Sequence, residues 1–245
     1  MYIHEETICG DTIVIRNHYS SRYHRKGMKR SENTESTSEA QERANRRKDI
    51  HELTIRMNSN FHDGDYYITL TYKKSERPPT PEEAKKDRQN FIRRIKKYYK
   101  EKGIEPKYIL LTGYGTRGAP HHHMVITGEI SVADLQREWK PKGALYLEPL
   151  NTEGEYSRLA TYFADHRKSW KVHDGKGRMW TCSRNIVRPE SQTWVVRRSD
   201  KYTDDPRPRK NYSVKKDTID QGYTSEGYPY LDYILVRPPG RKRDG

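Results

Sequence analysis

Three consecutive histidines, His121, His122 and His123, open a short run that continues with the apolar residues 124–126. Side chains alternate between the two faces of a β-strand. We therefore expect His121 and His123 to share one face, while His122 points to the other. Two imidazoles on one face can hold one divalent metal ion. The alternative is an exposed, polar strand start that binds nothing, and the apolar run that follows favours the metal site.

A second pair of reactive side chains lies in residues 155–167, where the apolar spacing of Leu159 and Phe163 predicts a helix. Tyr162 and His166 are one helical turn apart, on the flank of the buried stripe. A half-buried tyrosine beside an exposed histidine is the alternative interpretation. Combined with the histidine strand, the pair predicts a metal held by three imidazoles with a tyrosine hydroxyl nearby.

Phosphodiester transesterification is the chemistry that fits such a site. A phenol attacks a backbone phosphorus and forms a covalent phosphotyrosine link. The metal polarises a non-bridging oxygen of the phosphate. The ordinary pKa of a tyrosine is about 10, so the phenol proton must be removed or the anion stabilised by a neighbouring group.

The charge of the chain indicates the class of partner. The 245 residues have a net charge of +14, with 33% charged and only 31% hydrophobic residues. This charge favours polyanions, chiefly nucleic acid, with an anionic membrane surface as the alternative. No apolar run approaches the roughly 20 residues that span a bilayer, and no signal peptide pattern is present. We therefore expect a cytoplasmic protein that does not enter a membrane.

Basic side chains on the predicted elements are candidate DNA contacts, although a charged run is also typical of a solvated helix face. The strongest one-signed run lies in the helix expected from Pro81 to about residue 102. The candidates are Arg93, Arg94, Lys97, Arg117, Arg158 and Arg184.

The order of predicted elements favours an α+β fold, with a mostly antiparallel sheet covered by helices. Strands are expected at 12–15, 66–72, on both sides of the Gly-rich turn in 108–128, and at 144–148, with a strand or loop at 179–185. Helices are expected at about 38–59, 81–102, 131–140 and 155–167. We expect a basic N-terminal arm (1–35), a central domain (36–190) and an extended C-terminal arm (191–245).

An ordered set of segments resembles the HUH endonucleases that initiate rolling-circle replication, named for a histidine–hydrophobic–histidine pattern. The resemblance covers roughly residues 40–190 and looks closest to replication-associated proteins of small phages and bacterial mobile elements. It rests on the strand 68–72, the turn Gly113-Tyr114-Gly115 before the histidines, the Trp139…Gly143 spacing, the Tyr162 helix and Cys182-Ser183-Arg184-Asn185, with Gly227-Tyr228-Pro229-Tyr230 in the tail.

The resemblance implies a role for each candidate residue. The two outer histidines, His121 and His123, would bind Mg²⁺ or Mn²⁺. Tyr162 would form a 5′-phosphotyrosine and leave a 3′-hydroxyl as primer. The implied fold is an RRM-like antiparallel sheet with flanking helices, which makes residues 36–190 a nicking domain. The implied partners are single-stranded or hairpin origin DNA and host replication proteins, and the oligomeric state stays open.

The chain departs from the family pattern at several positions. His122 replaces the middle hydrophobic residue, and Gly113 stands where relatives often carry a glutamate ligand. Asp165 and His166 stand where relatives often carry lysine and glutamate. Single-tyrosine transposases of the superfamily place a metal ligand at that last position, so we expect His166 to be the third ligand. Lys168 is our candidate for the group that handles the tyrosine proton.

Other functions remain alternatives. A relaxase or a single-tyrosine transposase would use the same chemistry on a different DNA target. A non-catalytic RRM-like protein would hold single-stranded nucleic acid without cutting it. A basic structural or regulatory protein would leave the Tyr162–His166 spacing unexplained.

Overall fold

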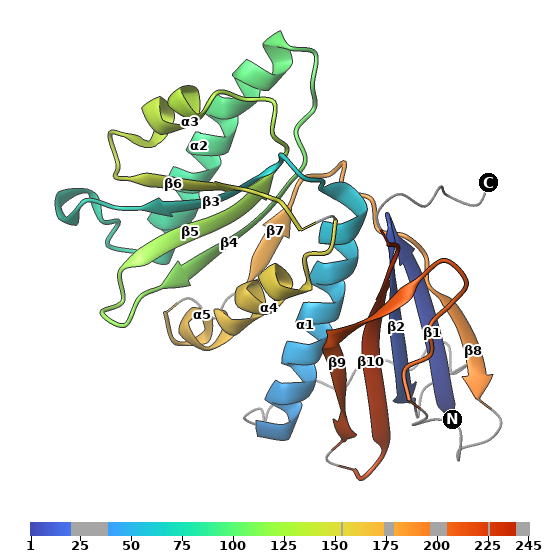
Figure 1. Cartoon of the computed structure of the whole chain (residues 1–245). Coiled ribbons are helices and arrows are strands. Elements are labelled where there is room, and N and C mark those ends of the chain that lie inside the picture. The colour runs from blue at the N-terminus through green and yellow to red at the C-terminus, as the bar shows by residue number, and fades with distance from the viewer. Residues whose placement is uncertain (21–38, 153, 174–178, 197–204, 225, 239–245) are drawn as a thin grey trace. The chain divides into compact units, whose positions relative to one another are not determined.

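The computed structural model describes residues 1–20, 39–152, 154–173, 179–196, 205–224 and 226–238 (Figure 1). The chain divides into two compact units, one made of residues 1–59 and 188–245 and the other of residues 60–187. Each unit is built on a five-stranded antiparallel sheet, which together with the helices confirms the α+β class. None of the helices in the described ranges has both the length and the apolar character needed to cross a lipid bilayer.

The unit of residues 60–187 contains the histidine strand, and its sheet has the order β6-β3-β5-β4-β7. Its strands are β3 (Tyr66–Thr71), β4 (Tyr108–Tyr114), β5 (Pro120–Ile126), β6 (Leu145–Pro149) and β7 (Trp180–Cys182). Its helices are the 3-10 turn η1 (Lys74–Glu76), α2 (Pro81–Glu101), α3 (Val132–Trp139), α4 (Ser157–Asp165) and α5 (Arg167–His173). In the view of Figure 1, α2 and α3 lie above the strands and α4 and α5 lie below them. The histidine strand β5 is the central strand of the sheet.

Helix α2 forms where the sequence predicts it, because its start is capped and one of its faces is apolar. The Thr80 side chain accepts a hydrogen bond from the Glu83 backbone N–H at 3.2 Å. This bond satisfies a backbone donor that has no partner within the helix. Phe91 and Ile95 of the apolar face are fully buried in a core that α2 and α3 share with the sheet.

The two faces of β5 are covered by different helices. Met124 belongs to the core under α2 and α3, and the ring of His122 lies 5.8 Å from that of Trp139 in α3. The alternation of the strand therefore turns His121 and His123 toward the other side. There, the ring of His123 lies 6.3 Å from that of Phe163 in α4.

The spacing of Trp139 and Gly143 has a steric cause at the end of β3. The indole N–H of Trp139 donates a 2.8 Å hydrogen bond to the Thr71 carbonyl, and the Thr71 N–H donates to the Ala144 carbonyl at 2.9 Å. A Cβ atom added at Gly143 would lie 1.9 Å from the same Thr71 carbonyl oxygen. Position 143, between the end of α3 and the start of β6, therefore accepts only glycine without a shift of the backbone.

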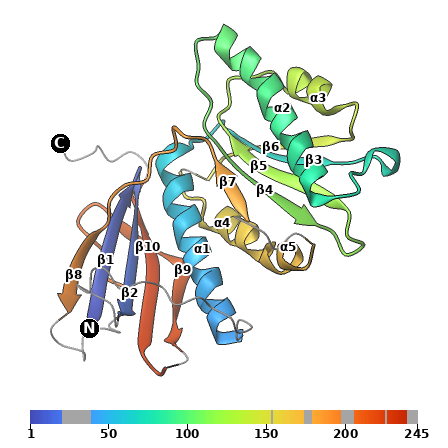
Figure 2. The ribbon, with the colours of Figure 1, turned by 180° about the vertical axis from the view of Figure 1, so that it is seen from behind.

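The unit of residues 1–59 and 188–245 has a sheet with the order β8-β1-β2-β10-β9. Its elements are β1 (Tyr2–Cys9), β2 (Thr12–Tyr19), α1 (Glu39–Asn60), β8 (Gln192–Val196), β9 (Ser213–Tyr223) and β10 (Pro229–Val236). Helix α1 lies beside this sheet in both views (Figures 1 and 2). Its Ile55 is fully buried with Cys9, Val14 and Ile234 from three strands.

The two ends of the unit of residues 60–187 are held together by one side chain. The Asn60 amide nitrogen donates to the Val187 carbonyl at 2.7 Å, and its amide oxygen accepts from the Val187 N–H at 2.8 Å. These are the first and last residues of the unit. The chain therefore leaves this unit close to where it entered.

This division differs from the predicted one of two arms around a central domain. Residues 191–245, expected as an extended arm, contribute β8, β9 and β10, and residues 1–35 contribute β1 and β2. The sheet has a core of its own on the face away from Ile55, formed by Ile13, Ile15, Leu231, Tyr233 and Leu235. The rest of the predicted N-terminal arm, residues 21–35, lies outside the described residues. The compact unit around the histidines spans 60–187 rather than 36–190.

Gly143→Ala tests the steric account of the Trp139–Gly143 spacing. The added methyl group cannot coexist with the Thr71 carbonyl, so α3 and β6 must shift. We expect a loss of about 1–3 kcal/mol in the free energy of unfolding, measured by urea denaturation. Gly115→Ala is the control, since the nearest atom to its added Cβ is 3.7 Å away. Equal stability of the two variants would contradict this account.

Candidate active site

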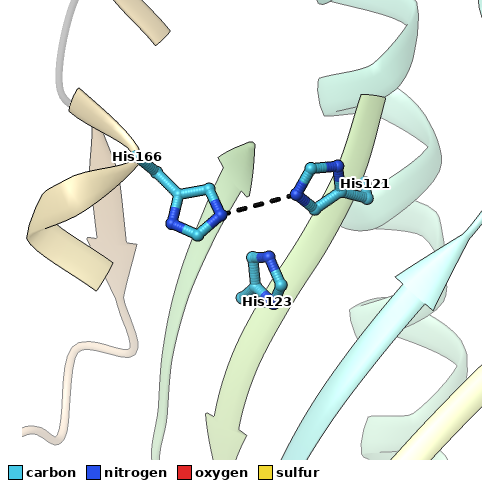
Figure 3. A group of neighbouring side chains, drawn as sticks. All are labelled: His121, His123 and His166. Carbon is cyan, nitrogen blue, oxygen red and sulfur yellow. Dashed lines mark hydrogen bonds between the residues drawn. The ribbon is translucent and has the colours of Figure 1, made fainter. Parts of the chain in front are cut away.

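Three histidines from two elements converge on one side of the sheet (Figure 3). His121 and His123 come from β5, and His166 directly follows α4. Each offers one ring nitrogen, and these three nitrogens lie within 4.8 Å of one another. Residues 155–167, expected as one helix, are divided between α4 and α5, with His166 at the junction. The structure thus brings together the three side chains that the sequence singled out as metal ligands.

Hydrogen bonds to the chain orient two of these rings. His166 Nδ1 lies 2.9 Å from the Tyr162 carbonyl, so it carries the proton and donates it. His166 Nε2 then has a free lone pair, and it lies 3.5 Å from His121 Nε2 (Figure 3). His121 in turn makes a hydrogen bond with the backbone of Ala119. The orientation of the rings leaves nitrogen lone pairs directed at a shared space, as a metal site requires.

Gly113 makes room for these rings. It is the direct cross-strand partner of His121 in the β4–β5 pairing. A Cβ atom at this position would lie 2.4 Å from His166 Cδ2 and 2.6 Å from His121 Nε2. The His166 ring therefore occupies the space into which any larger residue at position 113 would project. A larger residue in place of Gly113 would therefore force the rings of His121 and His166 to move from the positions that bring them together.

The electrostatics of the cluster favour neutral imidazoles. Burial, followed by the neighbouring His166 and His121, lowers the pKa of His123 to about 2. Burial and His166 also lower the pKa of His121 from its ordinary value. A neutral imidazole keeps a lone pair for a metal ion. A bound cation would stabilise three such lone pairs that lie close together. The three histidines could therefore bind a divalent metal.

Tyr162 lies directly beside this cluster. Its hydroxyl is 3.4 Å from His123 Nε2, and its ring packs edge-on against His123 and His166 with centroids 5.1 and 4.8 Å apart. The helix that carries it buries Phe163 and Ala164 next to it, which fixes its position, yet Tyr162 itself is 44% exposed. A nucleophile needs this combination of a fixed position and access from solvent.

His122 has a separate role on the opposite face of β5. It is completely buried, and its two ring nitrogens contact the hydroxyls of Tyr72 at 2.8 Å and Thr112 at 3.0 Å. Arg88 donates a 2.7 Å hydrogen bond to the Thr112 hydroxyl. Burial and Arg88 hold the pKa of His122 well below its ordinary value. A polar network therefore takes the place of the hydrophobic residue that the family pattern predicts here.

The predicted DNA contacts are spread over the unit. Arg93, Arg94 and Lys97 lie on α2, which covers the face of the sheet opposite to the three histidines. Arg94 is bound to the Glu138 carboxylate at 2.7 Å. The remaining three lie in the β4–β5 turn, in α4 and after β7: Arg117, Arg158 and Arg184. The α2 residues therefore do not line the same surface as Tyr162.

Sequence reasoning missed two side chains on the histidine face of β3, namely Tyr67 and Thr69. The Tyr67 hydroxyl lies 2.7 Å from His123 Nδ1, and the Thr69 hydroxyl lies 3.2 Å from the same atom. The alternation within 66–72 indicates that they share a face. Their proximity to His123 depends on the pairing of Thr69 with His123, which no local pattern specifies.

Part of the unit of residues 60–187 is similar to a known protein family. Residues 65–168 match a family model described as a replication-associated protein. The match supports a role in replication initiation. It lies within the unit of residues 60–187 and includes the three histidines and Tyr162, and it supports DNA as the partner. No curated protein and no solved structure matches the chain.

Replacing both His121 and His123 with alanine tests the metal site. Removing two of three imidazoles should abolish Mn²⁺ binding in calorimetry, while circular dichroism shows a folded protein. DNA binding should largely persist, because it depends on the basic surface. His62→Ala removes an exposed histidine outside the cluster and serves as the control. Unchanged Mn²⁺ affinity in the double variant would contradict the assignment.

Proposed function

We propose that this protein nicks and joins DNA through a phosphotyrosine intermediate on Tyr162, and so initiates rolling-circle replication of a phage, plasmid or mobile element. One observation carries the proposal: the Tyr162 hydroxyl lies 3.4 Å from a histidine of the three-histidine cluster. Both belong to the segment that is similar to replication-associated proteins. A phenol beside a cation site fits phosphoryl transfer to tyrosine.

The proposed reaction exchanges one phosphorus–oxygen ester bond for another. The Tyr162 oxygen forms a bond to a backbone phosphorus and loses its proton, while the bond from phosphorus to the 3′-oxygen breaks. The 3′-oxygen takes up a proton and becomes the hydroxyl from which a polymerase can extend. In the reverse direction, a 3′-hydroxyl attacks the phosphotyrosine, which rejoins the strand and releases Tyr162.

A divalent ion held by His121, His123 and His166 would polarise the phosphate under attack and stabilise its developing charge. The ligand set bears on which ion this is. Mg²⁺ prefers oxygen ligands, whereas imidazole suits transition metals. Of Mg²⁺ and Mn²⁺, three nitrogen ligands favour Mn²⁺.

Single-stranded DNA is the substrate form that the open part of this face fits best. Tyr146 of β6 is 62% exposed and is paired with Thr69, which is itself paired with His123. Tyr146 and His123 therefore point to the same side, two strands apart. An exposed aromatic ring can stack on an unpaired base but not on a base within a duplex. We propose that a base beside the cleaved phosphate stacks on Tyr146.

Tyr162→Phe tests the nucleophile. The change removes the hydroxyl and keeps the ring that packs against His123 and His166, so folding and DNA binding should stay near normal. The protein is incubated with Mn²⁺ and single-stranded DNA from a panel of candidate origin hairpins, then denatured. Wild type should give a covalent adduct, and the variant should give none.

Peptide mapping of the trapped adduct by mass spectrometry identifies the attacking residue. Tyr98→Phe is the matched control and should still form the adduct. A nucleotide on Tyr98, Tyr146 or another tyrosine, or an adduct with the Tyr162→Phe variant, would show that the assignment is wrong. A wild-type protein that binds the DNA without an adduct would point to the non-catalytic alternative.

Tyr146→Ala tests the proposed path of the strand. Loss of one base-stacking contact is expected to weaken binding of a single-stranded oligonucleotide by about 5- to 100-fold, measured by fluorescence anisotropy. Tyr146→Phe keeps the aromatic face and should bind like wild type. If the alanine variant binds as tightly as wild type, the strand does not pass over β6.

A further inference from the structure

Tyr67 of β3 is in direct contact with one member of the three-histidine cluster, His123. Its hydroxyl is 2.7 Å from His123 Nδ1, and the two rings are nearly parallel, with an interplanar angle of 9° and centroids 5.9 Å apart. The Thr69 hydroxyl donates a 3.2 Å hydrogen bond to the Tyr67 oxygen. Tyr67 therefore contacts His123 through Nδ1, the ring nitrogen that does not face Tyr162.

The two nitrogens of His123 have different surroundings. Nε2 lies on the side of Tyr162, at 3.4 Å from its hydroxyl, whereas Nδ1 is enclosed by the hydroxyls of Tyr67 and Thr69. A neutral imidazole has one N–H and one lone pair. Burial raises the pKa of Tyr67, and a hydrogen bond of its hydroxyl with Tyr162 raises this pKa further, as expected when Tyr67 donates its own proton to Tyr162. The Tyr67 oxygen can then accept the hydrogen of His123 Nδ1, which leaves the lone pair on Nε2, the nitrogen on the side of Tyr162.

We infer that Tyr67 is a positioning residue that fixes the tautomer and orientation of His123, so that His123 Nε2 is available as a metal ligand. This role is the same in kind as that of the Tyr162 carbonyl at His166 Nδ1. Such partners of metal-binding histidines typically change metal affinity by about 10- to 100-fold when removed. The inference rests on the metal site of the proposed function, but not on the nuclease reaction.

The neighbouring residue provides the contrast that separates positioning from packing. Tyr66 precedes Tyr67 on β3 and therefore points to the opposite face of the sheet. Its hydroxyl donates to the Ile130 carbonyl at 3.3 Å, away from the histidines. Both tyrosines are partly buried. Tyr66→Phe thus removes a comparable hydroxyl from the same strand without touching the cluster.

The test is Mn²⁺ titration calorimetry on the full chain, with Tyr67→Phe compared with wild type and Tyr66→Phe. The phenylalanine ring keeps the packing against Phe163 and Tyr162, whose centroids each lie 6.3 Å from that of Tyr67. We expect Tyr67→Phe to bind Mn²⁺ about 10- to 100-fold more weakly. Tyr66→Phe should bind like wild type, and both variants should unfold as cooperatively as the wild-type chain.

A second measurement is independent of metal binding. Nitrogen-15 NMR of the metal-free protein reports which ring nitrogen of His123 carries the proton. Wild type and Tyr66→Phe should show a proton on Nδ1, and Tyr67→Phe should show a shift toward the other tautomer. Unchanged Mn²⁺ affinity and an unchanged tautomer in Tyr67→Phe would overturn the inference. Equal weakening in the two variants would do the same, because it would show a general loss of stability.

The outcomes also separate this inference from the proposed function. If Tyr67→Phe weakens Mn²⁺ binding while wild type forms no covalent DNA adduct, the positioning role stands and the nuclease does not. If wild type forms the adduct and Tyr67→Phe leaves Mn²⁺ binding and the tautomer unchanged, the nuclease stands and the positioning role is wrong.

Discussion

The alternation of side chains along the central strand β5 is the constraint on which the candidate site depends. Three adjacent histidines cannot share one environment in a strand whose two faces are covered by different helices. His122 is completely buried on the side of α2 and α3, where Tyr72 and Thr112 contact both its nitrogens. His121 and His123 face α4, where they meet His166. A shift of one residue in the pairing of β5 would reverse these roles.

The parts of the fold that could be predicted are those marked by short sequence patterns such as helix caps and turns. The start of α2 carries its own cap and proline, and β5 follows a Gly-rich turn, so both were visible from short range. The sheet of residues 1–59 and 188–245 could not be predicted in this way. Its β9 is mostly exposed and has little apolar alternation, and β1 pairs with β8, which lies nearly 190 residues further along the chain. Pairing at such a distance leaves no periodic pattern in either segment.

The residues of the candidate site also differ in whether local sequence patterns identify them. The histidines and Tyr162 could be identified because their spacing within one strand and one helix has a direct geometric meaning. The role of Gly113 could not, since the absence of a side chain gains meaning only when the His166 ring is found in the space it leaves. Tyr67 likewise became relevant only through the register of β3 against β5. Neither contact could be predicted from the sequence, because each depends on which strands pair and in which register.

The Asn60–Val187 hydrogen bonds have a consequence for the order in which the chain is completed during synthesis. Residues 60–187 form a continuous unit that can close as soon as Val187 reaches Asn60. The other unit is interrupted, because β2 ends at Tyr19 and its partner β10 begins at Pro229. At a synthesis rate of about 5–20 residues per second, β10 is made roughly 10–40 seconds after β2, and this edge of β2 lacks its partner during that time. During synthesis, residues 60–187 are therefore complete while one edge of β2 still lacks its partner β10, and an unpaired strand edge is prone to intermolecular pairing.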